Sequence, residues 1–165
     1  MPLPSTMTPI ATQTLGSATA SVTFSSIAGT YTDLVLIINS NIPSGASGDG
    51  YLTFNGDNGT NYSYTQMYGN GTTAASNRGT SQTNIRAFTA ASTAQSTAII
   101  NILNYANTST YKTIVGRNND PSAVAVAVVG LWRNTAAITS LTLSNQGGAN
   151  FGTGSTFTLY GIKAA

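Results

Sequence analysis

The stretch "YTDLVLIIN", residues 31–39, is the part of the sequence that most directly indicates the fold. In an extended chain Leu34, Leu36 and Ile38 fall on one face, and Val35 and Ile37 fall on the other. A strand that is apolar on both faces is expected to be covered on both. The stretch therefore predicts a central β-strand, with more two-sided apolar surface than one small sandwich needs.

Short runs rich in β-branched and aromatic residues recur along the rest of the chain, separated by Gly, Asn, Ser or Pro. They include "GYLTFN" (50–55), "NYSYTQMYG" (61–69), "YKTIVG" (111–116), "AVAVAVVGLW" (123–132) and "STFTLYGI" (155–162). No long helical apolar period and no internal repeat interrupts them. About nine or ten strands at this spacing predict an all-β fold, an antiparallel β-sandwich of the jelly-roll type.

The first 18 residues differ from the rest because three prolines fall within the first nine positions. Proline resists both helix and central strand, so residues 1–18 are predicted to be an extended N-terminal arm and residues 19–165 a single sandwich domain. We expect the arm to tether the domain to a larger assembly and to become ordered when it lies along a partner or an adjacent subunit. The alternative is that part of it is the first edge strand of the sandwich. Four apolar residues are the candidates for this assembly contact: Leu3, Met7, Ile10 and Leu15.

Composition argues against most catalytic chemistry. Only 6% of the 165 residues are charged, and the chain has no His, no Cys and no Glu. General acid–base pairs, thiolate nucleophiles and zinc sites draw on those residue types. We therefore predict a protein that is not an enzyme, with no catalytic, cofactor-binding or metal-binding residues.

Charge and hydropathy also bear on partners. The six Lys and Arg residues are scattered, so the sequence indicates no nucleic-acid-binding surface. A spanning helix needs about 20 apolar residues, and the longest apolar run here is shorter. The N-terminus also lacks the pattern of a signal peptide. We expect neither a nucleic acid nor a membrane partner, and synthesis in the cytoplasm.

The loop "FNGDNGTNYS", residues 54–63, resembles a calcium site because oxygen-bearing side chains crowd it. Calcium takes six to eight oxygens and tight sites recruit several carboxylates, whereas Asp57 is the single carboxylate here. The sequence favours a structural hairpin turn in which Gly56, Asn58 and Gly59 adopt positive φ. The alternative is a weak calcium site that uses Asp49 and Asp57 together. Accordingly, Asp57→Asn is expected to leave thermal stability nearly unchanged.

Two groups of residues are candidates for binding surfaces. Tyr62, Tyr64 and Tyr68 could form an aromatic platform for a glycan, although tyrosine is also an ordinary strand residue. A second set of candidates, for a subunit interface, consists of Val35, Ile37 and Trp132, where Trp132 is either a core or an interface anchor. The surplus of apolar strand predicts a homo-oligomer, a trimer.

Several phrases of the sequence resemble a known group of proteins. They are "TPIATQTLGSATASVTFSSIAGTYTDLVLIINS" (8–40), "YLTFNGDNGTNYSYTQMYGNG" (51–71), "NYANTSTYKTIVGRNN" (104–119) and "VGLWRNTAAITSLTLSNQGGANFGTGSTFTLYGIKAA" (129–165). Together they look like the small structural proteins of tailed-phage and prophage virions. The resemblance implies a non-enzymatic β-sandwich located in the virion, assembled in the host cytoplasm, with the major capsid protein or another virion protein as partner.

The resemblance leaves the place in the virion open. A capsid decoration (cement) protein on the head surface is favoured because the chain is one domain without a coiled coil, a repeat or a long shaft. The alternative is a tail-fibre or tail-tip receptor-binding protein that recognises host glycans.

Overall fold

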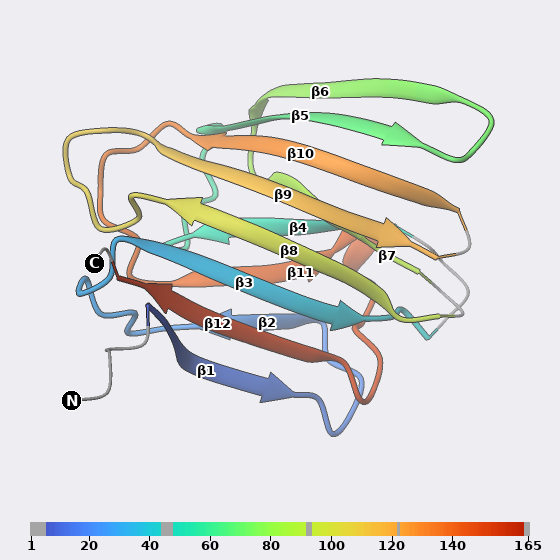
Figure 1. Ribbon diagram of the computed structural model, residues 1–165, viewed down its shortest axis with the longest axis horizontal. Coiled ribbons are helices and arrows are strands. Elements are labelled where there is room, and N and C mark those ends of the chain that lie inside the picture. Colours follow the sequence, from blue (N-terminus) through green and yellow to red (C-terminus); the bar gives the residue numbers. More distant parts are fainter. Residues whose placement is uncertain (1–5, 44–47, 92–93, 122, 164–165) are drawn as a thin grey trace.

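The computed structural model describes residues 6–43, 48–91, 94–121 and 123–163, which form two antiparallel β-sheets stacked as a sandwich (Figure 1). The predicted all-β antiparallel sandwich is confirmed. A jelly roll is not: that pattern has eight strands in two Greek keys, whereas the twelve strands described here divide into eight and four. The helical content of the described residues is one 3-10 turn, Gln146–Gly148.

The strands follow one another across each sheet in an order far from their order in the chain. Across the larger sheet they are β1 (Met7–Thr14), β12 (Thr156–Ile162), β3 (Asp33–Ser40), β8 (Ser96–Leu103), β9 (Lys112–Asp120), β10 (Val124–Trp132), β5 (Tyr62–Gly69) and β6 (Ala74–Gln82). Across the smaller sheet they are β2 (Ser21–Phe24), β11 (Leu141–Asn145), β4 (Gly48–Phe54) and β7 (Ile85–Ala90).

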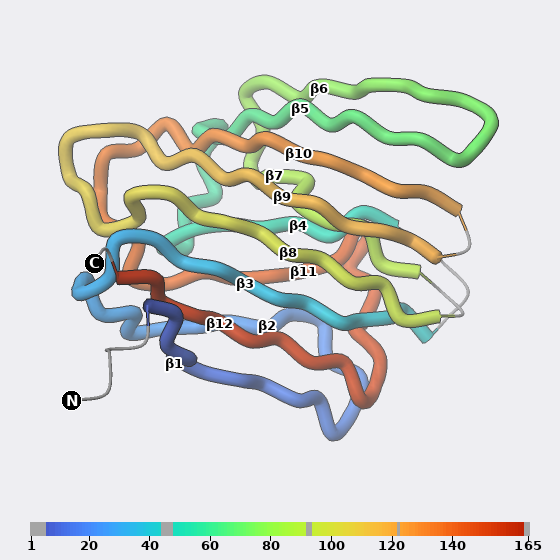
Figure 2. The backbone as a smooth tube through the Cα atoms, viewed as in Figure 1, coloured from blue at the N-terminus to red at the C-terminus, as the bar shows by residue number. Residues whose placement is uncertain are grey.

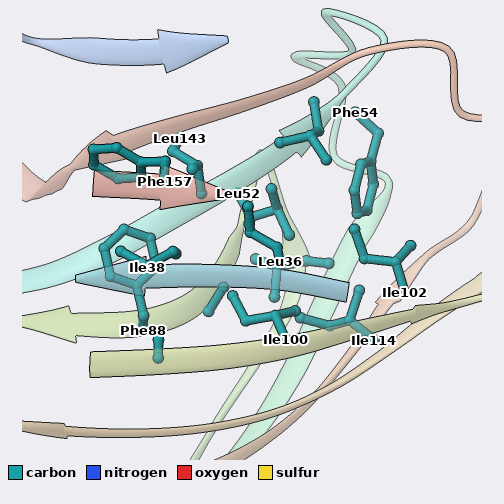
Figure 3. Close-up of a cluster of buried hydrophobic side chains, with 14 of the residues drawn as sticks. Leu36, Ile38, Leu52, Phe54, Phe88, Ile100, Ile102, Ile114, Leu143 and Phe157 are labelled. Atoms are coloured by element: carbon teal, nitrogen blue, oxygen red, sulfur yellow. The ribbon is translucent and has the colours of Figure 1, made fainter. Parts of the chain in front are cut away.

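The core lies between the two sheets and is built from alternate residues of each strand. In β3, Leu34, Leu36 and Ile38 are buried, and Figure 3 shows Leu36 and Ile38 among side chains that include Leu52 and Leu143 of the smaller sheet. Removing such side chains from water stabilises the fold by about 1.5–3 kcal/mol each. Val35 and Ile37 on the opposite face of β3 are only half-buried by the described part of the chain.

The N-terminal segment belongs to the sandwich. Strand β1 pairs with β12 from Met7↔Ile162 to Thr14↔Thr156, with an irregularity between Pro9 and Ala11. Proline is tolerated there because β1 is an edge strand and the register shifts beside it. The prediction of an arm outside the sandwich is therefore wrong for residues 7–14, and the edge-strand alternative holds.

The candidate assembly residues of this segment have different environments. Ile10 and Leu15 are partly buried and pack against the core. Met7 is 38% exposed, and Leu3 lies outside the described residues. Two of the four apolar residues thus help to hold β1 on the sandwich.

Strand β6, "AASNRGTSQ", was not predicted, because it lacks the β-branched and aromatic residues typical of strands. It forms by pairing with β5 across a turn that Asn70 organises: its Oδ1 accepts hydrogen bonds from the backbone N–H groups of Thr72 (3.1 Å) and Thr73 (2.7 Å). Figure 2 shows this β5–β6 hairpin as the outermost pair at one side of the larger sheet, opposite the side that carries β1.

Candidate functional site

The loop that follows Phe54 joins the two sheets. Strand β4 lies in the smaller sheet and β5 in the larger one, so the predicted hairpin turn is wrong. Positive φ occurs at Asn55 (52°) and Gly56 (67°) rather than at Asn58 or Gly59. Asn tolerates this conformation better than most residues. The glycines and asparagines of this loop therefore allow the chain to cross from the smaller sheet to the larger one; they do not form a turn between two paired strands.

Asp57 is the centre of a hydrogen-bond network in this loop. Its Oδ2 accepts from Trp132 Nε1 (2.7 Å) and Asn61 Nδ2 (2.9 Å), and its Oδ1 accepts from the backbone N–H of Gly59 (2.8 Å). Burial acts to raise the pKa of Asp57, but hydrogen bonds led by that from Trp132 outweigh it and lower the pKa below its ordinary value. The described residues contain no group of three or more His, Cys, Asp or Glu that could hold a metal ion. Both carboxylate oxygens of Asp57 accept hydrogen bonds from their own chain.

Tyr62 and Trp132 belong to the same network and are fully buried. The Tyr62 hydroxyl accepts from the Phe54 N–H (3.0 Å) and donates to the Asp57 carbonyl (3.1 Å). Its ring stacks on Trp132 with centroids 6.3 Å apart and planes at 15°. Burial raises the pKa of Tyr62 to about 12. Trp132 is a core residue, so its assignment to a subunit interface is wrong. Tyr62 is also too deeply buried to contact a glycan.

The other two tyrosines of β5 differ in exposure. Tyr64 is 9% exposed, and a Cβ at Gly79 would lie 2.7 Å from its ring, so that glycine allows the ring to lie close to β6. The Arg86 guanidinium carbon lies 5.8 Å from the centre of the Tyr64 ring. Tyr68 is 39% exposed. The predicted three-tyrosine glycan platform is therefore wrong, and Tyr68 alone of the three is accessible.

The outer face of the larger sheet carries two rows of side chains that run across the strands. Cross-strand pairing aligns one row as Ile37, Ile99, Arg117, Ala127, Met67 and Ser76, and the next as Val35, Asn101, Val115, Val129, Thr65 and Arg78. Met67, Val115 and Val129 are 64%, 43% and 52% exposed. We call these twelve residues the outer-face rows. The structure brings Val35 and Ile37 together on this surface without Trp132.

A groove of about 970 Å³ runs along the first row, from Ser76 and Met67 to Ile99. Its lining includes Met67, Ile99, Ala125 and Ala127, with Arg117 as a charged member. The small Ala127 side chain of β10 lies between the larger Met67 on β5 and Arg117 on β9, which deepens the surface there. The groove makes the outer face concave and mainly apolar, which suits packing against another apolar surface.

A second hollow, of about 350 Å³, lies between the β5–β6 hairpin and the edge of β7. We call it the β5–β7 cleft. Seven of its lining residues are polar or aromatic: Asp49, Gln66, Tyr68, Asn70, Asn77, Arg86 and Thr89. Arg86 Nη2 lies 3.0 Å from Asp49 Oδ2. Burial raises the pKa of Asp49, and Arg86 offsets this only in part.

The edge of β7 at this cleft is satisfied by side chains from the larger sheet. Gln66 Nε2 donates to the Arg86 carbonyl (3.2 Å), and Asn118 Oδ1 accepts from the Thr89 N–H (3.1 Å). Buried backbone groups at a strand edge need such partners. Sequence reasoning did not find this set, because its members come from strands far apart in the chain and no motif links them.

Two further charged residues, Lys112 and Asp33, hydrogen-bond to backbone groups of their own chain. Lys112 is fully buried and its Nζ donates to the carbonyls of Thr110 (2.8 Å) and Thr135 (3.1 Å); burial lowers its pKa. Asp33 Oδ1 accepts from the Asn104 N–H at 2.7 Å. Among the described residues no helix is both long and apolar enough to cross a membrane.

The concave outer face and the β5–β7 cleft are thus two surfaces of the described residues that could take a partner. Comparison with known proteins assigns neither surface a role, since no family model matches the chain and no curated protein matches it.

Proposed function

We propose that the protein is a non-enzymatic structural subunit of a phage particle, a capsid decoration protein that packs on the head surface. One observation carries the structural role: the outer-face rows continue from half-buried Val35 and Ile37 to exposed Val115 and Val129 without a break in the sheet. Exposed apolar patches of this kind mark surfaces that pack against another protein. The place in a phage particle is supported by the resemblance of the sequence to virion proteins.

The charges of the surface suggest what its partner looks like. Arg117 and Arg78 are the two charged members of the outer-face rows, so a matching surface is apolar with acidic side chains or free carbonyl groups at the rim. The partner we propose is the major capsid protein or another virion protein. Copies of the chain also associate with one another, as a trimer, which closes a ring of identical contacts.

Val129→Asp tests the role of this surface. Val129 is 52% exposed, so the variant should fold, but the new carboxylate would be desolvated if the face packs against a partner. We expect the wild-type chain to co-sediment with phage particles that lack this protein, and Val129→Asp to lose most of that binding. The matched control is Thr23→Asp, which places the same charge at an exposed position of β2 in the smaller sheet. Full occupancy by Val129→Asp would contradict the proposal.

Location and self-association are tested separately. Antibody raised against the chain should label the heads of intact particles in electron micrographs, whereas label at the tail tip would replace decoration with the tail-fibre or receptor-binding alternative. Light scattering at micromolar concentration should give the mass of a trimer. A monomeric mass would remove self-association from the proposal and leave the heterologous partner.

A further inference from the structure

The inward face of β5 changes character along the strand. At its start Tyr62 is buried in the core, whereas further along Gln66 and Tyr68 line the β5–β7 cleft, with Asn77 of β6 directly opposite Gln66. Inward faces of sandwich strands are normally apolar because the facing sheet covers them. The volume of this cleft, about 350 Å³, lies within the range of sites for small molecules.

Several polar groups of the cleft have hydrogen-bonding capacity that the described residues do not use. A guanidinium carries five N–H donors, and in Arg86 one of the nitrogens, Nη2, pairs with Asp49 while Nε is buried without a partner. The side-chain amide of Asn77 forms no hydrogen bond within the described part of the chain and can both donate and accept. The Asn70 carbonyl oxygen is occupied by its own turn, which fixes that side chain at the rim.

The charges of the cleft limit the chemistry of a ligand. Asp49 and Arg86 lie 3.0 Å apart and offset one another, so an anion would meet the carboxylate and a cation the guanidinium. A neutral ligand with many hydroxyl groups avoids both conflicts, because each hydroxyl donates to a carboxylate or an amide oxygen and accepts from a guanidinium or an amide N–H. The 39% exposed ring of Tyr68 supplies an apolar face at the same place.

We propose that the β5–β7 cleft binds a neutral saccharide unit, whose ring packs on Tyr68 and whose hydroxyls bind Asn77 and the Asp49–Arg86 pair. Gln66 holds the backbone of β7 in position through its bond to the Arg86 carbonyl and so is a positioning residue. This site goes beyond the proposed structural role and does not depend on it, because one isolated chain contains all of these residues. It also differs from the three-tyrosine platform, of which only Tyr68 takes part.

The test uses the full chain, labelled with nitrogen-15, and four probes: the methyl glycosides of glucose, galactose, mannose and N-acetylglucosamine. We expect at least one of them to shift the backbone amide signals of residues 66–70, 75–79 and 86–89, with a Kd of about 1 mM, as suits a single small ligand in an open cleft. Tyr68→Ala and Asn77→Ala should each weaken this binding about tenfold. Neither side chain is buried, so both variants should keep a folded spectrum.

Two substitutions outside the cleft serve as matched controls. Tyr111→Ala removes a tyrosine that is 53% exposed on another part of the surface, and Asn58→Ala removes an exposed asparagine; both should bind the glycoside as the wild type does. The proposal fails if no glycoside shifts these signals at about ten times the expected Kd, or if Asn77→Ala binds with unchanged affinity. Inorganic phosphate is the last probe: shifts of the same amides at lower concentration would show an anion site instead.

Discussion

The two halves of β5 carry the same alternation of side chains and have opposite environments. Tyr62 is fully buried against Trp132 and the end of β4, while Tyr68, on the same face, is 39% exposed beside the edge of β7. The strand period decides which side chains share a face. The width of the facing sheet decides whether that face becomes core or cleft. The larger sheet has twice as many strands as the smaller one. The first half of β5 therefore faces the core, while its second half lines the cleft.

The halves differ in the same way in their hydrogen bonds. In the closed half the Tyr62 hydroxyl, the Trp132 indole and both carboxylate oxygens of Asp57 all have partners within the chain. In the open half Asn77 has no such bond among the described residues, and Arg86 Nε is unpaired. Substitutions should therefore change stability in the closed half and binding in the open half.

The largest effect is expected for Trp132→Ala. The indole fills the space between Phe54 and Tyr62, at centroid distances of 5.5 Å and 6.3 Å, and its loss also removes one of the two side-chain donors to Asp57 Oδ2. We expect the free energy of unfolding to fall by about 3–5 kcal/mol, measured by urea denaturation. A loss below about 1 kcal/mol would show that the core around the first half of β5 is not tightly packed.

Tyr62→Phe isolates the hydroxyl group from the ring. The change leaves the Phe54 N–H and the Asp57 carbonyl without their partner, and a buried unsatisfied group costs about 1–3 kcal/mol. The matched control is Tyr64→Phe on the same strand, whose hydroxyl makes no hydrogen bond within the described residues and whose removal should cost less than about 0.5 kcal/mol. Equal effects of the two substitutions in thermal denaturation would contradict the network.

Asp57→Asn should be destabilising by about 1 kcal/mol at neutral pH, because the amide keeps one acceptor oxygen and turns a donor toward groups that donate already. The sequence alone predicted nearly unchanged thermal stability for this variant, but the hydrogen bonds of Asp57 lead us to expect a loss. The folded-state pKa of Asp57 is lowered, so its contribution is complete above the unfolded pKa of about 3.9 and is lost as the pH falls through the folded value. The difference between wild type and variant should therefore shrink in acid. Denaturation curves at neutral and low pH check this, and a constant difference would argue against the lowered pKa.

The sequence predicted the elements whose signal is local. Alternating apolar runs located β3, β5, β9, β10 and β12, and the lack of a helical period identified the all-β class. It failed for β1 and β6, since each is stabilised by its neighbour in the sheet rather than by its own residues: β1 by β12, and β6 by β5. The loop at Asp57 was misassigned for a related reason, because residue types alone do not show that the flanking strands lie in different sheets.

The candidate sites were harder to predict than the fold. Three tyrosines at a spacing of two or four residues suggested one platform, but burial of Tyr62 and Tyr64 depends on β4, β6 and Arg86, which come from other parts of the chain. The Asp49–Arg86 pair joins residues from paired strands of the smaller sheet, and no periodicity within either strand predicts it. Only the topology brings these groups to the one cleft.

Tyr68→Ala should have the smallest effect on stability. The side chain lines the cleft beside β7 and is 39% exposed, and substitutions at exposed positions usually change the free energy of unfolding by no more than about 0.5 kcal/mol. Tyr62→Ala removes the same side chain from the same face of the same strand, six positions earlier in the chain, and should cost about 3–5 kcal/mol because it empties part of the core. Parallel urea denaturation of the two variants measures the contrast directly. If Tyr68→Ala destabilised the protein as much as Tyr62→Ala, the end of β5 would be part of the core, and the cleft could not be a preformed binding site. If Tyr68→Ala leaves stability unchanged while it weakens glycoside binding, the first half of β5 stabilises the core and the second half binds the ligand.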